Sequence, residues 1–196
     1  MPPCHGGDRR FESGRARQIN RITLVVFSYF MAKFRITNEH RRSEVGNVID
    51  VLRRPRLWIP TDKDYPDHGS WLEKTEFEIG TDKKRAFLAY SSSKPVGTIV
   101  YQRHEDSPEV LEIRNISILP EAQGRYLGSF LLRNTEIEGA TNDFPDVTKI
   151  MVDTKTTNTG MICFLIEHGY GVHEITDLYG LGTGLDVVLI KSLPAK

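Results

Sequence analysis

A glutamate and a glycine-containing turn are the two features of this sequence that could do chemistry. Glu112 lies within a β-prone run, and Gln123 follows it by 11 residues at the start of the turn. A carboxyl group in a partly apolar cleft has a raised pKa, and it can take the proton that an amine nucleophile must lose near neutral pH. The sequence therefore offers Glu112 as a candidate general base. The plainer alternative is a solvated strand residue that forms an ion pair with Arg114 or Arg103.

The turn at residues 123–129 (Gln-Gly-Arg-Tyr-Leu-Gly-Ser) is built like an anion site. Pro120 ends the preceding strand, and the turn leads directly into a helical pattern. The first N–H groups of a helix lack internal partners, and the helix dipole adds about half a positive charge there. Glycines let a pyrophosphate approach the backbone closely. The turn therefore predicts a phosphate site, although two glycines also fit a helix cap with close packing.

The strand that carries Glu112 contains a break in its apolar alternation. Leu111 and Ile113 would share one face, while Ile116 and Ile118 would share the other. An extra residue between Ile113 and Ile116 restores a common buried face, which is the pattern of a β-bulge. A bulge here would free backbone groups to bind an extended ligand.

The rest of the sequence predicts a regular succession of elements. Prolines and acidic residues over 58–69 indicate a loop, and a Ser-rich turn at 91–95 indicates a β-hairpin. The other expected elements are strands at 34–37, 86–90, 96–101, 149–153 and 185–190, and helices at 45–52, 71–77, 127–137 and 161–166. Antiparallel strands followed by strand–helix–strand–helix–strand predict an α/β protein with a mixed sheet.

Two blocks of this sequence resemble the acetyl-CoA-binding blocks of the GNAT acyltransferase superfamily. Gln123 and Gly128 match the first and last positions of the motif Arg/Gln-x-x-Gly-x-Gly/Ala. Tyr126 replaces the inner glycine, and a tyrosine is tolerable there if the backbone is right-handed. The second block runs from Asn158 to Tyr170, and the resemblance covers roughly residues 34–193.

The resemblance implies a fold and a co-substrate. The fold is the GNAT one: a mixed, mostly antiparallel sheet flanked by helices and splayed between its fourth and fifth strands. Acetyl-CoA would lie in the splay, with its pantetheine paired to the backbone of residues 116–118 and its pyrophosphate on the amides of 124–129. The implied binding residues are Ile116, Ser117, Ile118, Gln123, Gly124, Arg125, Tyr126, Leu127, Gly128, Ser129 and Asn158.

The resemblance also implies N-acetyl transfer by direct attack of a primary amine, with Glu112 as general base and an N–H near Ile118 polarising the carbonyl oxygen. The family often uses a tyrosine as general acid where this chain has Leu165. Either the coenzyme A thiolate leaves without a proton from the protein, or another group supplies one. Tyr179 is the first candidate for that group, before Tyr126. Asp153 could orient Lys155 or contact the substrate.

The acceptor would be a small-molecule or protein amine, bound between the loop at 58–71 and a hairpin around 179–184. Two other functions stay open: a non-catalytic acyl-CoA-binding regulatory module, and a toxin-type acyltransferase acting on aminoacyl-tRNA. No metal set is visible, and no apolar run is long enough to cross a membrane.

Charge divides the 196 residues into two expected parts, although 26 basic and 26 acidic residues balance overall. Residues 1–33 carry six basic and two acidic side chains, a net charge of +4, and residues 34–196 carry −4. The first part is interpreted as a basic extension, a mis-assigned start before Met31, an extra ordered element or a targeting segment. The second is interpreted as one acyltransferase domain.

The balanced charge gives no support for a dedicated nucleic-acid binder. Two cysteines cannot form a disulfide framework, which points to a reducing, cytoplasmic setting. A single domain of this size must complete its acceptor site from its own loops or from a second copy of itself, as a homodimer would.

Overall fold

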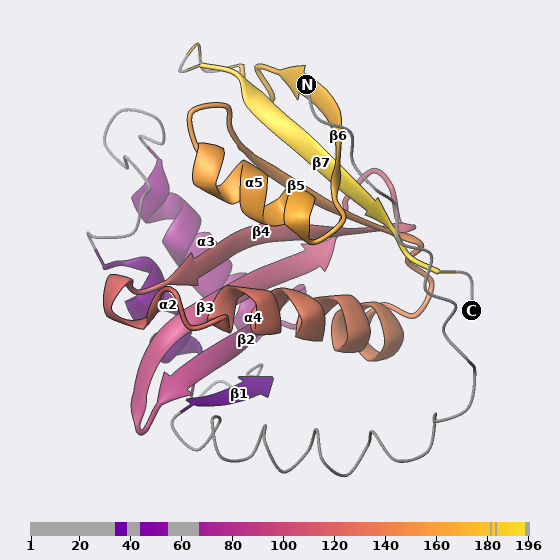
Figure 1. The fold of residues 1–196 in the computed structure, drawn as a ribbon. Helices are drawn as coiled ribbons and strands as arrows, with labels where there is room; N and C mark the ends of the chain where they lie inside the picture. Colours follow the sequence, from indigo (N-terminus) through magenta and orange to yellow (C-terminus); the bar gives the residue numbers. More distant parts are fainter. Residues whose placement is uncertain (1–33, 39–43, 55–66, 181, 183, 195–196) are drawn as a thin grey trace, which may run out of the picture. The chain divides into compact units, whose positions relative to one another are not determined.

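The computed structural model describes residues 34–38, 44–54, 67–180, 182 and 184–194. These residues form a seven-stranded sheet in the order β1-β2-β3-β4-β5-β7-β6 (Figure 1). The strands are β1 (Phe34–Asn38), β2 (Lys84–Ser91), β3 (Lys94–Arg103), β4 (Val110–Ile118), β5 (Lys149–Lys155), β6 (Gly171–Thr176) and β7 (Asp186–Ser192). All neighbours pair antiparallel except β4 and β5, which are parallel. The expected mixed, mostly antiparallel sheet is confirmed.

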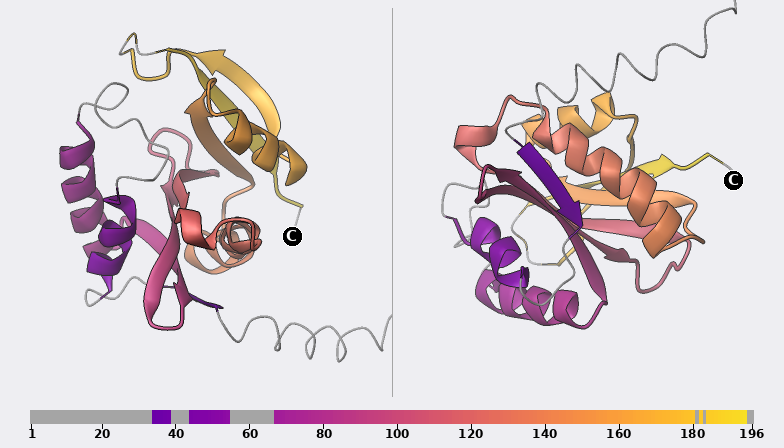
Figure 2. Two further views of the ribbon diagram at one scale, coloured as in Figure 1. Left: turned by 60° about the vertical axis from the view of Figure 1, so that its left-hand side comes forward. Right: turned by 90° about the horizontal axis from the view of Figure 1, so that it is seen from below.

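Helices cover both faces of this sheet (Figure 2). The helices α2 (Val45–Leu52) and α3 (His68–Gly80) lie on one face. The other face carries α4 (Leu127–Asn134), its π-helical continuation Thr135–Asp143, and α5 (Thr159–Glu167). Apolar side chains at helical spacing face the sheet from both sides, and their burial is the main stabilising contribution to this arrangement. The expected helix at 45–52 is confirmed at both ends.

The predicted bulge in β4 is confirmed. Ile113 pairs with Tyr101, whereas Asn115 pairs with the adjacent Val100, so Arg114 is the extra residue. The bulge lets Leu111 and Ile113 stay buried in the core while the strand is re-aimed beyond them.

Beyond the bulge, β4 and β5 separate. Their parallel pairing runs only from Val110–Lys149 to Ile113–Val152, although β4 continues to Ile118 and β5 to Lys155. The splay expected between the fourth and fifth strands is therefore present, and it begins at the bulge.

Several expected boundaries were wrong. Helix α3 begins at His68, so the expected loop does not extend to residue 69, and most of that loop lies outside the described residues. The helix expected over 127–137 continues to Asp143, where a wide π turn places Gly139 against the ring of Tyr101. Strand β6 was not predicted from the sequence. The proposals about residues 1–33 also lie outside the described residues.

Candidate active site

A cleft of about 1340 Å³ opens where β4 and β5 separate. One end is lined by β4 after the bulge, the following turn and the first residues of α4 and α5. The other end is lined by Asp67, His68 and Trp71 on or beside α3, together with Arg114, Asp153 and Tyr179. The lining thus combines backbone groups of β4 and the turn with charged side chains from β4, β5 and the start of α3. The part lined by these charged side chains is called the charged end below.

The backbone of β4 presents alternate residues to the splay. The N–H of Leu119 donates to the carbonyl oxygen of Val96 on β3 (2.8 Å), so the neighbouring Ile118 directs its backbone away from β3. The carbonyl oxygen of Ile118 accepts a hydrogen bond from Nε2 of Gln123 (2.9 Å). By the same alternation the backbone of Ile116 faces the splay, whereas that of Ser117 faces β3. An extended amide ligand would therefore meet Ile116 and Ile118.

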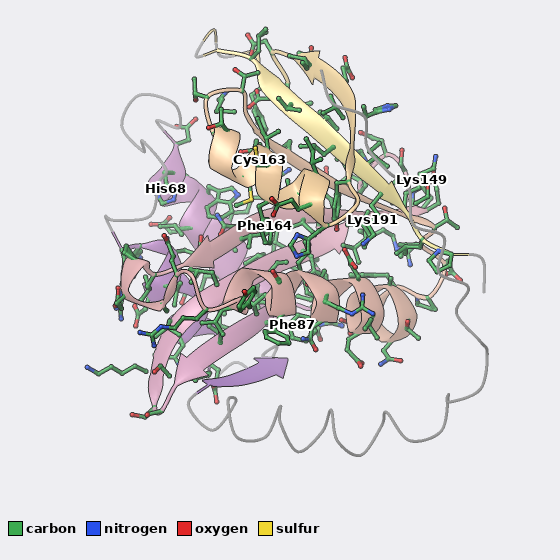
Figure 3. The ribbon with its side chains drawn as sticks, viewed as in Figure 1. His68, Phe87, Lys149, Cys163, Phe164 and Lys191 are labelled. Atoms are coloured by element: carbon green, nitrogen blue, oxygen red, sulfur yellow. The ribbon has the colours of Figure 1, made fainter. Side chains whose placement is uncertain are left out.

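The turn into α4 has the form of an anion cradle. Gly124 and Tyr126 both have positive φ, +68° and +61°, and the first N–H bonded within the helix is that of Phe130, to Tyr126. The earlier N–H groups of this turn are those that a helix leaves without an internal partner. A Cβ on Gly128 would lie 3.4 Å from the ring of Phe164, which α5 directs towards α4 (Figure 3). The residues present therefore fit a pyrophosphate held by backbone amides.

The condition under which a tyrosine is easily tolerated at position 126, a right-handed backbone, is not met. The φ of Tyr126, +61°, is left-handed, so this tyrosine holds a conformation that glycine adopts at lower cost. Its side chain is 74% exposed and leaves the backbone of the turn accessible. Arg125, the next expected phosphate contact, is also exposed at this turn.

Asn158 caps α5 beside the splay. Its Oδ1 accepts from the N–H of Met161 (3.3 Å), and its Nδ2 donates to Oγ1 of Thr154 on β5 (3.1 Å). The side chain therefore links the end of β5 to the start of α5, which fixes the wall of the cleft at this point.

Glu112 is 6% exposed and has both carboxylate oxygens engaged. Oε1 accepts from Arg114 in an ion pair, and Oε2 accepts from Nε2 of Gln102 at 2.7 Å. It lines a smaller hollow of about 220 Å³, which shares Trp71 and Arg114 with the large cleft. Of the two interpretations of Glu112, the structure contains the ion pair with Arg114.

Asp153 stands at the charged end of the cleft, directly after the last residue of β5 that pairs with β4. The hydroxyl of Tyr179 donates to its Oδ2 at 2.9 Å. Burial raises the pKa of the Asp153 carboxyl, although the charge of Arg114 and the hydrogen bond from Tyr179 oppose this. Burial lowers the pKa of Arg114, but Tyr179, Glu112 and Asp153 together raise it above its usual value.

A buried ion pair between β5 and β7 lies beside the charged end of the cleft. Nζ of Lys155 lies 3.0 Å from Oδ2 of Asp186, and the Asp186 side chain is fully buried. The same ammonium donates to the carbonyl oxygen of Gly184 (3.3 Å) and lies 6.0 Å from the centre of the Tyr179 ring. Lys155 therefore holds the segment that carries Tyr179 close to β5.

The comparisons with known proteins agree with this geometry. The model of the "Acetyltransferase (GNAT) family" matches residues 48–171, which is more than half of the chain. The chain belongs to the GNAT acetyltransferase family. No curated protein matches it.

Solved GNAT structures share this fold at low sequence identity. A putative acetyltransferase of the GNAT family from Desulfovibrio desulfuricans has a TM-score of 0.65 at 10% identity, covering 81% of this chain and 98% of the other. The PaiA N-acetyltransferase of Thermoplasma acidophilum, solved in complex with coenzyme A, has 0.63 at 17%, covering 82% and 99%. The ribosomal-protein-S18-alanine N-acetyltransferase of Escherichia coli has 0.61 at 14%, covering 83% and 96%.

Against the GNAT pattern, two positions of the second block keep structural roles. Leu165, which stands where the family often has an acidic tyrosine hydroxyl, is fully buried in the core. Tyr170 is also buried, and its hydroxyl donates to Oε1 of Glu136 (3.2 Å). Neither side chain lines the large cleft in the described part of the chain, so neither is placed to donate a proton there.

Sequence reasoning did not single out Arg114 as a cleft residue. It included His68 and Trp71 in the acceptor loop at 58–71, whereas the structure places both on α3. His68 stacks on Trp71 with ring centres 5.7 Å apart, and burial lowers the pKa of its imidazole. The spacing of His68 and Trp71 along α3 was a usable signal, but the helix was expected to begin three residues later.

Within the described residues, no group of three or more His, Cys, Asp or Glu side chains could hold a metal ion. No helix in the same residues has the length and apolar character needed to cross a membrane.

Proposed function

We propose that this chain is an N-acetyltransferase that moves the acetyl group of acetyl-CoA to a primary amine by direct attack. The observation that carries the proposal is the β4–β5 splay, which puts backbone groups and a helix N-terminus at one end of a cleft and charged side chains at the other. Acetyl-CoA supplies a thioester whose carbonyl carbon an unprotonated amine can attack.

The residues of the chain divide the work along the cleft. The turn at 124–129 would bind the pyrophosphate, and the backbone of Ile116 and Ile118 would bind the pantetheine amides. The N–H of Ile118 is suited to polarise the thioester carbonyl, because fixed donors aimed at a developing oxyanion lower the barrier. The aromatic and charged end, with Trp71 and Tyr179, would receive the amine.

Proton transfer needs a base and an acid. Glu112 is the base predicted from the sequence, and Tyr179 is the predicted acid. Tyr179 lines the cleft and its hydroxyl is held by Asp153, which supports a role there. If Glu112 is the base, Glu112→Gln lowers turnover at least about tenfold and leaves acetyl-CoA affinity unchanged.

Two measurements on the full chain test the proposed function. Coenzyme A binding is measured by calorimetry, and thiol release from acetyl-CoA is followed across a panel of polyamines, amino acids, arylamines and peptides with free N-termini. Binding together with turnover on an amine supports the enzyme. Binding without turnover on any amine would instead identify a non-catalytic acyl-CoA-binding module.

The position of the co-substrate is tested at Gly128. Gly128→Leu would press on Phe164 and narrow the space between α4 and α5, so we expect coenzyme A to bind at least tenfold more weakly. Gly46→Leu is the matched control, because a Cβ there meets nothing within 4 Å, Gly46 does not line the cleft, and the helix α2 tolerates leucine. Equal coenzyme A affinities of the two variants would show that the pyrophosphate does not bind at this turn.

We also propose three further features that were predicted from the sequence. They are a catalytic domain over 34–196, a cytoplasmic location, and completion of the acceptor site either by the chain's own loops or by a second copy. The toxin-type alternative predicts arrest of growth when the chain is induced, and normal growth would remove it.

A further inference from the structure

We propose that Asp153, rather than Glu112, accepts the proton of the attacking amine, and that Tyr179 and Arg114 hold its carboxylate in position. This inference rests on the proposed acetyl transfer and names the residue that performs its proton step.

The first argument is position. Asp153 follows Val152, the last residue of β5 paired with β4, so it lies where the two strands part. It lines the large cleft together with Arg114 and Tyr179. Among the described residues, Glu112 lines the smaller hollow and not the large cleft. A base must be within hydrogen-bond reach of the proton that it takes. Asp153 is a carboxylate of the cleft lining at the point where β4 and β5 part, whereas Asp67 precedes α3.

The second argument is the state of the carboxylate oxygens. Both oxygens of Glu112 accept hydrogen bonds, one from Arg114 and one from Gln102. In the part of the chain that the structure describes, Asp153 has one hydrogen-bond partner, Tyr179 at Oδ2. Its Oδ1 is therefore available for a proton from the substrate, whereas Glu112 would have to break a bond to its neighbours first.

The third argument is electrostatic. The charged and titratable groups with the largest effects on the pKa of Asp153 are Arg114 and Glu112 on β4, Asp186 on β7, and Tyr179. Lys155, two residues further along β5, lines the same cleft and pairs with Asp186. Burial raises the pKa of Asp153, Arg114 and the Tyr179 hydrogen bond lower it, and the two other carboxylates raise it. A carboxyl group whose pKa is raised towards neutral pH is a better proton acceptor than one with an ordinary pKa.

The step balances without a further reactant. The amine nitrogen forms a bond to the acetyl carbon, the carbon–sulfur bond breaks, and the proton on nitrogen passes to Oδ1 of Asp153. The Tyr179 hydroxyl gives its proton to the departing sulfur. The Asp153 carboxyl group then turns its protonated oxygen towards Tyr179 and returns a proton to it. One proton thus leaves nitrogen and one reaches sulfur, and both side chains return to their starting states.

The test compares variants of the full chain on the amine that releases thiol fastest in the panel. We expect Asp153→Asn to lower kcat about 100-fold and to leave coenzyme A affinity unchanged. It should also remove the acidic limb of the pH profile of kcat, which is the fall of kcat at low pH caused by protonation of Asp153. Glu112→Gln should keep that limb. Asp146→Asn, at an exposed turn, is the matched control and should behave as the unsubstituted chain. The limb due to ionisation of the amine itself stays in every variant.

Tyr179→Phe gives a second readout that a purely structural role would not produce. Its hydrogen bond lowers the pKa of Asp153, so its loss should move the acidic limb of kcat to higher pH. This measurement also serves if Asp153→Asn does not fold.

Each other result overturns the inference. Loss of the acidic limb in Glu112→Gln and its persistence in Asp153→Asn would assign the base to Glu112. An unshifted limb in Tyr179→Phe would exclude the Tyr179–Asp153 contact from the proton step. Failure of the proposed function is a separate outcome, because the unsubstituted chain would then bind coenzyme A and release no thiol with any amine.

Discussion

Tyr126 holds a backbone conformation that favours glycine, at the position where the family motif has glycine. A left-handed conformation costs a non-glycine residue about 1 kcal/mol, and this side chain is mostly exposed, so it gains little packing in return. We expect Tyr126→Gly to raise the free energy of unfolding by up to about 1 kcal/mol in urea titrations. Tyr126→Gly should also alter coenzyme A affinity, because Tyr126 lies in the turn proposed to bind the pyrophosphate.

Ser92 provides the control for this substitution. It also has positive φ (+57°), but it lies at the β2–β3 turn, away from the cleft. Ser92→Gly should stabilise the chain by a similar amount and leave coenzyme A affinity unchanged. A loss of stability in Tyr126→Gly would show that its side chain makes contacts that outweigh the backbone strain.

Asp153 makes a second prediction at the residue scale, this time for stability. Its pKa is raised in the folded chain, so folding is opposed at pH values above that raised pKa, where the group must be charged in both states. We expect Asp153→Asn to be more stable than the unsubstituted chain at pH 8. The difference should shrink as the pH falls through the folded pKa and vanish below the unfolded value, near 3.9. Urea unfolding across this range measures it, and a difference that does not depend on pH would contradict it.

At the scale of elements, β5 and β7 are joined at their ends by the ion pair of Lys155 and Asp186. Asp186 is fully buried, and its Oδ1 has no hydrogen-bond partner among the described residues. Lys155→Met leaves this charge buried without its counter-charge, so we expect a loss of about 3 kcal/mol in the free energy of unfolding.

The double variant separates the charge effect from packing. Lys155→Met combined with Asp186→Leu removes both charges, and it should recover most of the stability lost in the single variant. Thermal and urea unfolding compare the two. If the double variant is as unstable as the single one, the loss comes from packing around the Lys155 stem.

The elements also show how far sequence patterns reach. The bulge in β4 was predictable, because Leu111 and Ile113 are out of phase with Ile116 and Ile118 and only an extra residue reconciles them. Strand β6 gave no such signal, since nearly all of its side chains are exposed and no face of it alternates in burial. The start of α3 was missed because His68 and Gly69 are weak helix formers.

At the scale of the whole molecule, the co-substrate end of the cleft is local in sequence and the proton-transfer end is not. Residues 116–129 and their helix form one continuous segment, so motif and spacing could indicate them. Arg114, Asp153 and Tyr179 come from three separate segments and meet only through tertiary packing. Whether the oxygens of Glu112 are already engaged depends on Gln102 across the β3–β4 pair, which spacing along the chain does not encode.

The extent of the catalytic domain is tested by shortening the chain. The family match covers residues 48–171, and the described cleft residues lie between Asp67 and Tyr179. A chain that begins at Met31 should therefore bind coenzyme A with the same affinity, measured by calorimetry. A weaker affinity would place part of residues 1–30 in the binding site.

The parallel pairing of β4 with β5 has a consequence for the sheet as a whole. Among the described strands, the β1–β4 half pairs with the β5–β7 half through four residue pairs of β4 and β5. The sheet thus consists of two halves joined by a short parallel ladder. An extended ligand between β4 and β5 would supply hydrogen bonds in place of those that the two strands do not make beyond the bulge. A ligand bound there should join the two halves, so that slow amide hydrogen exchange extends across both of them. The melting temperature should then rise with the fraction of the chain that has ligand bound.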